Sequence, residues 1–232
     1  MLIITASIVI LAIIIWFYQN KTAKKIKKWQ QALKLNIHQP IFNKLYCDVN
    51  GFNLSKMARL KQDTIAFIYG EIEFESFIAL LSLCKPQVNT IFYDLGSGTG
   101  KAVIACAMVF NIQKSYGIEL LVPLHKCAQK QQERLGQLES YRENAKKIVF
   151  IQGDFLQKSF VDGTIIFINA ATFIAELWEQ LSTHVEQVKP GTLIISTSKV
   201  LNSKRFILRK IVPVRMSWGI VNAFIQQRLS DI

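Results

Sequence analysis

The sequence is poor in the residues that hold metal ions or form disulfide bonds. Its 232 residues include four cysteines and three histidines. The cysteines are far apart, form no CxxC pair and have no histidine at metal-site spacing, which predicts reduced, mostly buried thiols. We expect neither a disulfide framework nor a metal site.

Acidic residues are also scarce. Lys and Arg number 28 against 16 Asp and Glu, which gives a formal charge of +12. This excess predicts attraction to anionic lipid, nucleic acid or an acidic protein partner, and it does not specify the fold. One cationic cluster lies near the C-terminus and consists of Lys199, Lys204, Arg205, Arg209, Lys210 and Arg215.

Charge is absent from Leu2–Tyr18, LIITASIVILAIIIWFY. As a helix this segment reaches roughly 26 Å at about 1.5 Å per residue, close to the thickness of a thin bilayer. Lysines follow the segment and none precede it, which is the reverse of the charge order in a cleavable signal peptide. Residues 1–19 are therefore predicted to be the transmembrane anchor of a single-pass membrane protein with its remaining chain in the cytoplasm. A buried core helix is the alternative.

Residues 20–68 are predicted to form a basic helical linker and N-terminal extension. The stretch KTAKKIKKWQQALKL, residues 21–35, carries apolar residues at helical spacing among lysines. This pattern fits either a helix lying on lipid headgroups or a solvated connector helix. From His38 to Asn53, Pro40, Gly51 and several asparagines predict an irregular linker.

Residues 69–232 alternate between strand-like and helix-like segments. A helix is expected at Phe74–Cys84. Runs suited to buried strands are Thr90–Leu95, Ser115–Glu119, Lys147–Gln152, Thr164–Asn169 and Thr192–Thr197. Two further runs, Lys210–Val214 and Gly219–Gln227, lie close enough for an antiparallel hairpin. The predicted fold is α/β, with a Rossmann-like, seven-stranded, mostly parallel sheet whose last strand is antiparallel, plus the N-terminal transmembrane helix.

A glycine turn follows the first predicted strand in IFYDLGSGTGKAV, residues Ile91–Val103. Gly96, Gly98 and Gly100 give GxGxG, and Lys101 stands where a dinucleotide fingerprint has its third glycine. Such a turn lets a ligand approach the backbone, and the next helix N-terminus favours a carboxylate or phosphate. NAD is therefore disfavoured.

Acidic residues at the strand ends favour S-adenosyl-L-methionine as the cofactor. Asp94 would repel a pyrophosphate and can accept hydrogen bonds from an α-ammonium group. Glu119 ends the next strand, where an acidic side chain can bind ribose hydroxyls. Asp154 and Phe155 follow the third strand and suit the adenine amino group and ring. In this order and spacing, the residues predict a class I methyltransferase.

Several motifs resemble those of the non-SET histone-lysine methyltransferases of the disruptor-of-telomeric-silencing (Dot) type. They are YGEIEF, YDLGSGTGKAV, YGIE, GDF, IFINAATF and MSWGIVNAFIQ, and together they span Tyr69 to Arg228. The resemblance implies that Tyr69 and Glu71 belong to a loop covering the methionine end of the cofactor. It also implies a role for Asn169 at the end of the fourth strand, and identifies Trp218 as the channel tryptophan.

The expected reaction is methyl transfer to a protein lysine by in-line displacement, for which an aromatic channel would exclude water from the amine. Trp218 and Phe173 are the candidate channel walls, with Asn169 orienting the amine or the cofactor. The predicted cofactor contacts are Tyr69, Glu71, Asp94, Gly96, Ser97, Gly98, Gly100, Glu119, Asp154, Phe155 and Asn169. The chain departs from the family where Ala223 or Phe224 replaces a channel tyrosine, and it lacks the long basic nucleosome-binding tail.

Other functions remain open at this point. A nucleic-acid amino-methyltransferase would carry an NPPY-like segment, whereas residues 169–172 read NAAT. Short lysine methyltransferases that modify an ATP synthase rotor subunit are a second resemblance and suggest a membrane protein as substrate. A membrane-tethered interaction module without catalysis is the non-enzymatic alternative.

Overall fold

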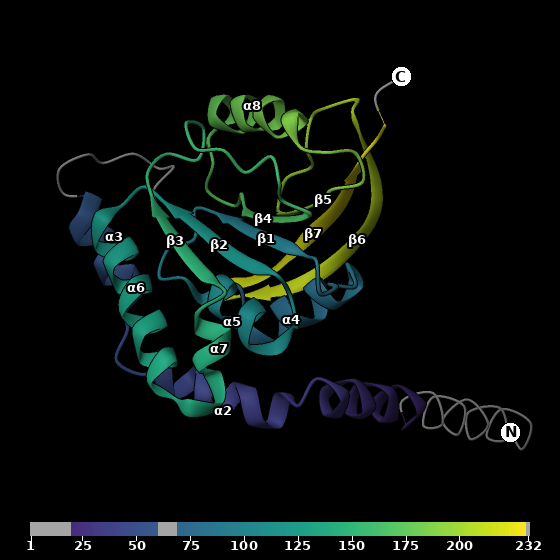
Figure 1. Ribbon diagram of the computed structural model, residues 1–232. Helices are drawn as coiled ribbons and strands as arrows, with labels where there is room; N and C mark the ends of the chain where they lie inside the picture. The colour runs from purple at the N-terminus through teal and green to yellow at the C-terminus, as the bar shows by residue number, and fades with distance from the viewer. Residues whose placement is uncertain (1–19, 60–68, 231–232) are drawn as a thin grey trace, which may run out of the picture. The chain divides into compact units, whose positions relative to one another are not determined.

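The computed structural model of the protein describes residues 20–59 and 69–230 (Figure 1). The chain divides into two compact units, Met1–Ile41 and Phe42–Ile232. In the described part of the first unit, residues 20–32 are helical and carry five lysines, and all residues from 21 to 28 are exposed. The second unit contains the whole sheet.

The predicted transmembrane helix is corrected by the structure. Across residues 20–59 and 69–230, no helix is sufficiently long and apolar to cross a bilayer. The fold prediction was wrong in including such a helix, and the single-pass membrane localisation with a cytoplasmic domain was wrong with it. Within the described residues, the helix over residues 20–32 carries five lysines, and charged side chains are costly inside hydrocarbon. The segment Leu2–Tyr18 itself lies outside the described residues.

The irregular linker predicted from His38 to Asn53 is also wrong. Helix α2 spans Leu35–Leu45 with Pro40 inside it, and α3 spans Gly51–Arg59. Proline in a helix sacrifices one backbone hydrogen bond. Burial offsets this cost, because the Phe42 ring lies 4.9 Å from that of Tyr46 and 4.7 Å from that of Phe74.

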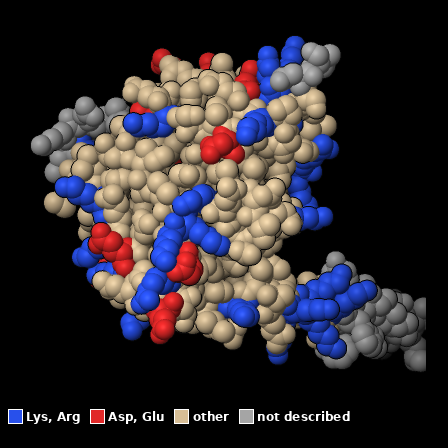
Figure 2. All heavy atoms as spheres, in the orientation of Figure 1, with Lys and Arg blue, Asp and Glu red and all other residues tan. Residues whose placement is uncertain are grey.

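The seven-stranded sheet predicted from the sequence is confirmed. Its strands are β1 Ile91–Leu95, β2 Lys114–Glu119, β3 Ile148–Gln152, β4 Ile165–Asn169, β5 Leu193–Thr197, β6 Phe206–Met216 and β7 Gly219–Arg228. Their order is β3-β2-β1-β4-β5-β7-β6, and β7 runs in the direction opposite to the other six strands. The β6–β7 hairpin is longer than predicted, with a register shift between Leu208 and Lys210. Lys and Arg side chains predominate along the edge where β6 lies (Figure 2).

Helices cover both faces of the sheet (Figure 1). They are α4 Phe74–Leu83, α5 Lys101–Val109, α6 Val122–Gln137, α7 Arg142–Ala145 and α8 Ala175–His184, with short 3₁₀ helices η2 Glu139–Tyr141 and η3 Val185–Gln187. On the α4 face, the ring of Phe77 contacts those of Phe92 and Phe167. On the α8 face, Tyr93 and Trp178 belong to the other buried cluster. The alternation of Phe92 and Tyr93 between the faces reflects the two-residue period of a strand.

The strand order places the functional site. β1 lies between β2 and β4, so the chain leaves β1 toward one side of the sheet and later returns on the other. In open α/β sheets, ligands bind in the crevice beyond the carboxyl ends of strands at such a switch point. The glycine turn between β1 and α5 occupies this position.

Candidate functional site

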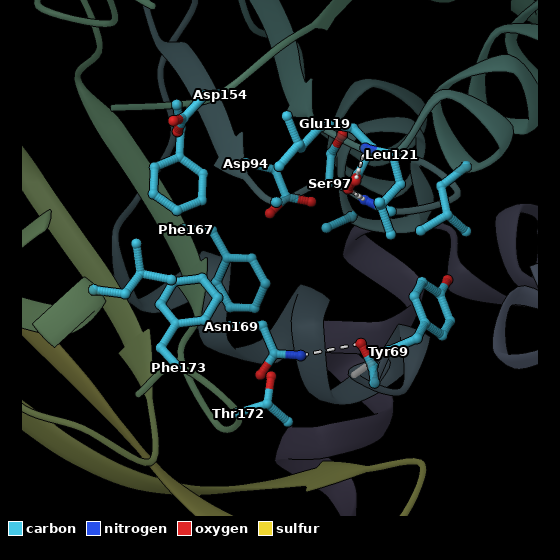
Figure 3. A pocket seen from close by; sticks show the side chains of 18 of the residues that line it. Tyr69, Asp94, Ser97, Glu119, Leu121, Asp154, Phe167, Asn169, Thr172 and Phe173 are labelled. Carbon is cyan, nitrogen blue, oxygen red and sulfur yellow. Dashed lines mark hydrogen bonds between the residues drawn. The ribbon is translucent and has the colours of Figure 1, made fainter. Parts of the chain in front are cut away.

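A cavity of about 440 Å³ lies at the carboxyl ends of β1, β2 and β4 (Figure 3). Every predicted site residue except Gly100 and Trp218 lines it. The predicted residues that line it are Tyr69, Glu71, Asp94, Gly96, Ser97, Gly98, Glu119, Asp154, Phe155, Asn169 and Phe173. The sheet therefore brings together side chains that are up to about one hundred residues apart in the sequence, as the switch-point rule predicts.

The glycine turn, residues Gly96–Gly100, has a backbone that favours glycine at alternate positions. Gly96, Gly98 and Gly100 have φ of 84°, 54° and 82°. A Cβ atom on Gly98 would lie 2.5 Å from Cε2 of Tyr69, and one on Gly100 would lie 2.5 Å from Cζ of Phe150. The absence of a side chain on Gly98 thus leaves space for the Tyr69 ring in the cavity wall. The absence of one on Gly100 lets α5 pack closely on the sheet.

Two buried carboxylates face the cavity from neighbouring strands. No described residue donates a hydrogen bond to Asp94, and burial, with the charge of Glu119, raises the pKa of Asp94 to about 8. Burial likewise raises the pKa of Glu119, although its carboxylate accepts hydrogen bonds from the backbone N–H of Gly98 at 2.7 Å and of Leu121 at 2.8 Å. Carboxylates whose burial makes ionisation costly favour a cationic ligand.

The YGE segment, residues Tyr69–Glu71, forms the opposite wall of the cavity. The Tyr69 hydroxyl donates to Glu71 Oε1 at 2.6 Å and lies 2.7 Å from Thr99 Oγ1. Glu71 Oε2 in turn lies 2.5 Å from Lys101 Nζ. These contacts attach the segment to the glycine turn and to the first residue of α5.

Asn169 connects the end of β4 to the YGE segment. Its Nδ2 donates to the carbonyl of Gly70 at 3.0 Å, as the dashed line in Figure 3 marks, and its Oδ1 accepts from Thr197 Oγ1 at 2.7 Å. These two bonds fix the orientation of the amide. They leave one N–H and one oxygen lone pair of Asn169 for a ligand.

Trp218 does not line the cavity but lies against its wall. A Cβ on Gly70 would approach Cζ3 of Trp218 to 2.0 Å, so the ring packs directly on the Gly70 backbone. The side chain remains 46% exposed. Trp218 therefore faces solvent beside the YGE segment, which separates it from the cavity that Gly70 lines.

Phe155 and Phe173, predicted for different ends of the site, lie together. Their rings are stacked with centroids 5.8 Å apart and an interplanar angle of 25°. Phe173 thus extends the apolar surface beside Phe155, and its role as a channel wall stays a prediction. Asp154 Oδ1 accepts a hydrogen bond from the backbone N–H of Leu156, which leaves its other oxygen available.

Sequence reasoning missed several polar residues of the site, among them three that hold its parts together. Lys101 lines the cavity, Thr197 orients Asn169, and the backbone N–H and side-chain hydroxyl of Ser217 bind the backbone of Glu71. Thr197 ends β5, so the rule that polar residues at strand ends gather at one edge could have identified it. No local signal marks Ser217, because its partner is 146 residues away.

The family model and the relatives found by sequence agree on one family. The family model described as "Histone methylation protein DOT1" matches residues 54–214. An H3 lysine-79-specific histone-lysine N-methyltransferase from Caenorhabditis elegans is 34% identical over 146 residues, covering 60% of this chain and 15% of that protein. Its counterpart from Kluyveromyces lactis is 30% identical over 145 residues, covering 58% and 25%. The matched part of this chain thus spans a quarter or less of these two relatives.

Shorter and structural relatives extend the comparison. A protein-lysine N-methyltransferase from Saccharolobus islandicus is 26% identical over 118 residues, covering 50% of this chain and 67% of that protein. An RNA methyltransferase from Salinibacter ruber, solved in complex with S-adenosyl-L-homocysteine, has a TM-score of 0.55 at 21% identity, covering 68% of this chain and 93% of that one. At this identity the structural likeness shows the fold.

The contact between Gly98 and Tyr69 can be tested with Gly98→Ala. We expect loss of stability of about 1–2 kcal/mol from the left-handed backbone, together with at least a tenfold loss of affinity for S-adenosyl-L-homocysteine, because the methyl group displaces the Tyr69 ring. Thermal unfolding and calorimetric titration measure the two effects. Gly191→Ala is the matched control, because Gly191 has φ of 90°, no atom within 4 Å of its Cβ position and no place in the cavity. Equal affinity losses in the two variants would contradict the assignment.

Proposed function

Because the chain belongs to the family of the histone methylation protein DOT1, we propose that it transfers a methyl group from S-adenosyl-L-methionine to a lysine side chain of a protein. The family model matches residues 54–214, which is more than half of the chain. The observation that carries the proposal is the cavity in which Asp94 and Glu119 face the glycine turn and the YGE segment. Family, fold and cavity chemistry point to the same reaction.

The residues of the cavity fit this cofactor. Asp94 has no protein donor among the described residues and can accept hydrogen bonds from an α-ammonium group. Each Glu119 oxygen already accepts one backbone N–H and has a second lone pair for a ribose hydroxyl. The stacked Phe155 and Phe173 offer an apolar surface for an adenine ring.

The protein's part in this reaction is to position the reactants and to exclude water from the amine. S-adenosyl-L-methionine, when bound, supplies a methyl group on a positively charged sulfur. A lysine attacks through the free electron pair of its neutral amine, so it must lose its proton before the attack. The amine is itself the nucleophile, and no side chain of this chain acts as one. Exclusion of water from the amine beside the YGE segment would favour its neutral form, because desolvation lowers the pKa of an ammonium group. Asn169, fixed by Gly70 and Thr197, supplies an oriented amide at this end of the cavity.

A protein lysine is the proposed acceptor, without restriction to a histone. Relatives named for H3 lysine-79 are much longer than the segment that this chain matches. The Saccharolobus islandicus relative is named only as a protein-lysine N-methyltransferase, and a larger share of its length is matched. Membrane and lipid partners are not part of the proposal.

Radiolabelled cofactor tests the reaction and the acceptor class together. The full chain is incubated with S-adenosyl-L-methionine carrying a tritiated methyl group and with a cell lysate, and the labelled material is digested to its monomers. We expect protease-sensitive label that is recovered as Nε-methylated lysine. Asp94→Ala, which removes the proposed ammonium partner, is the inactive control. Label that resists protease and is released by nuclease would refute the proposal.

Cofactor affinity should depend on pH through Asp94. Its pKa of about 8 means that the carboxyl group is largely protonated at pH 6, and a neutral carboxyl group cannot pair with an ammonium. Binding must then release a proton, so affinity should rise toward a limit of about tenfold per pH unit between pH 6 and 7.5. Above about pH 8 the affinity should fall as the ligand's α-amino group loses its proton.

Calorimetry across this pH range, in buffers with different ionisation enthalpies, measures both the affinity and the released proton. Asp94→Asn should bind more weakly and with a flatter pH profile. A flat profile for the unaltered protein would show that Asp94 is already ionised in the empty site.

Trp218→Ala should separate transfer from cofactor binding. The ring covers Gly70 from outside the cavity, so its removal should misplace the acceptor while leaving the cofactor contacts in place. We expect turnover at saturating cofactor to fall by at least about tenfold, since small misplacements near reacting atoms are costly. Cofactor affinity should change by less than about threefold by the same reasoning.

Ile220→Ala is the matched control for this experiment. Ile220 is 68% exposed on the same hairpin and should tolerate the change. Unchanged turnover in Trp218→Ala, measured with the labelled cofactor, would remove the tryptophan from the acceptor side of the site.

A further inference from the structure

The charges that line the cavity are strongly unequal. Five acidic side chains reach it, from Glu71, Asp94, Glu119, Asp154 and Glu176, and Lys101 supplies the one cation among the described lining residues. An anionic group entering such a cavity is repelled by the carboxylates unless it lies beside Lys101. The proposed cofactor carries a carboxylate at its methionine end, so this imbalance bears directly on how it binds.

Lys101 stands at a place where a helix disfavours a positive charge. It is the first residue of α5, directly after the N-cap Gly100, and no acidic residue lies in that first turn. The positive end of the helix dipole makes this position unfavourable for a lysine and favourable for an anion. Backbone N–H groups of the first turn can also bind the anion that Lys101 attracts.

Contacts with the YGE segment and with Tyr46, which directly follows α2, hold the lysine at the cavity wall. Nζ of Lys101 lies 2.5 Å from Oε2 of Glu71 and 5.2 Å from the centre of the Tyr46 ring. The Tyr46 hydroxyl donates to the carbonyl of Thr99 at 3.1 Å, which fixes that ring against the glycine turn. The lysine side chain nevertheless remains 25% exposed, and its ammonium has donors beyond the one used by Glu71.

We infer that Lys101 is the residue that makes the site selective for a ligand carrying a carboxylate, by pairing with that carboxylate while Glu71 keeps the ammonium in place. The inference rests on the proposed function, because it assigns one end of the proposed cofactor to one residue. Asp94, just before the glycine turn in the sequence, then takes the ligand's ammonium, and Lys101, directly after the turn, takes its carboxylate. The zwitterion is recognised by two opposite charges, and removal of either end should weaken binding.

A purely structural role for Lys101 makes a different prediction. If the ion pair with Glu71 only fastens the YGE segment, then loss of the lysine should weaken every ligand of the cavity by the same factor. If Lys101 recognises the carboxylate, its loss should weaken only ligands that have one. The ratio of two affinities therefore separates the two roles, and it needs no catalytic turnover.

The experiment compares S-adenosyl-L-homocysteine with its decarboxylated analogue, S-adenosyl-3-thiopropylamine, by calorimetric titration of the full chain. The unaltered protein should prefer the carboxylate ligand by about tenfold to a hundredfold, the range for a charge-assisted hydrogen bond in a partly buried site. Lys101→Met keeps the length of the side chain without its charge and should reduce this preference to less than about threefold, with the decarboxylated ligand bound as before. Retained binding of that ligand also shows that the variant is folded.

Two further variants complete the test. Lys101→Arg keeps a cation and should keep most of the preference. Glu71→Gln leaves the lysine without its counter-charge and should increase the preference for the carboxylate ligand, whereas a fastening role predicts equal losses for both ligands. An unchanged ratio in Lys101→Met would overturn the inference and leave the proposed function standing. Failure of the unaltered protein to bind S-adenosyl-L-homocysteine at all would overturn both.

Discussion

The insertion of the Tyr69 ring between two glycines is the contact on which the rest of the site depends. A Cβ on Gly51 would lie 2.3 Å from Cε1 of this ring, and a Cβ on Gly98 would lie 2.5 Å from Cε2. The ring also meets Phe52 edge to face, with centroids 5.4 Å apart. Because neither glycine has a side chain, the Tyr69 ring fits between them. It thereby holds the YGE segment over the glycine turn, and this segment forms the second wall of the cavity. A sheet without this insertion would offer an open crevice at β1.

The two buried carboxylates carry an electrostatic cost that a cationic ligand can remove. Asp94 and Glu119 are buried near each other, and burial raises the pKa of both. Such an arrangement destabilises the fold, because each carboxylate must either protonate or remain charged with little solvation. A cationic ligand removes the penalty by supplying the missing counter-charge. The two carboxylates that destabilise the fold are thus those that would bind the proposed cofactor, which is typical of functional sites.

The sequence predicts the elements that follow local rules and misses those that depend on distant contacts. The strands were found because their apolar runs have the right length, and the glycine turn because its residues alternate after an aspartate. Helix α2 was missed because Pro40 is a helix breaker by local propensity, whereas the packing of Phe42 on Phe74 stabilises it through tertiary contact. The apolar N-terminal run suggested a transmembrane helix for the same local reason. Lys101 was noticed only as a departure from a dinucleotide motif, since its partner Glu71 is 30 residues away.

The cofactor contacts and the acceptor side that we propose share one stretch of backbone. Ile72 pairs with Met216 as an isolated bridge, and the backbone N–H of Ser217 donates to the carbonyl of Glu71 at 2.8 Å. Through these bonds the end of β6 holds the YGE segment from outside, while Asn169 holds Gly70 from inside. Any ligand that shifts the YGE segment must therefore also shift the turn that carries Trp218. Both sets of contacts converge on Gly70 and its neighbour Glu71, so a cofactor that orders the YGE segment would also order the surface on which we propose that the lysine is placed.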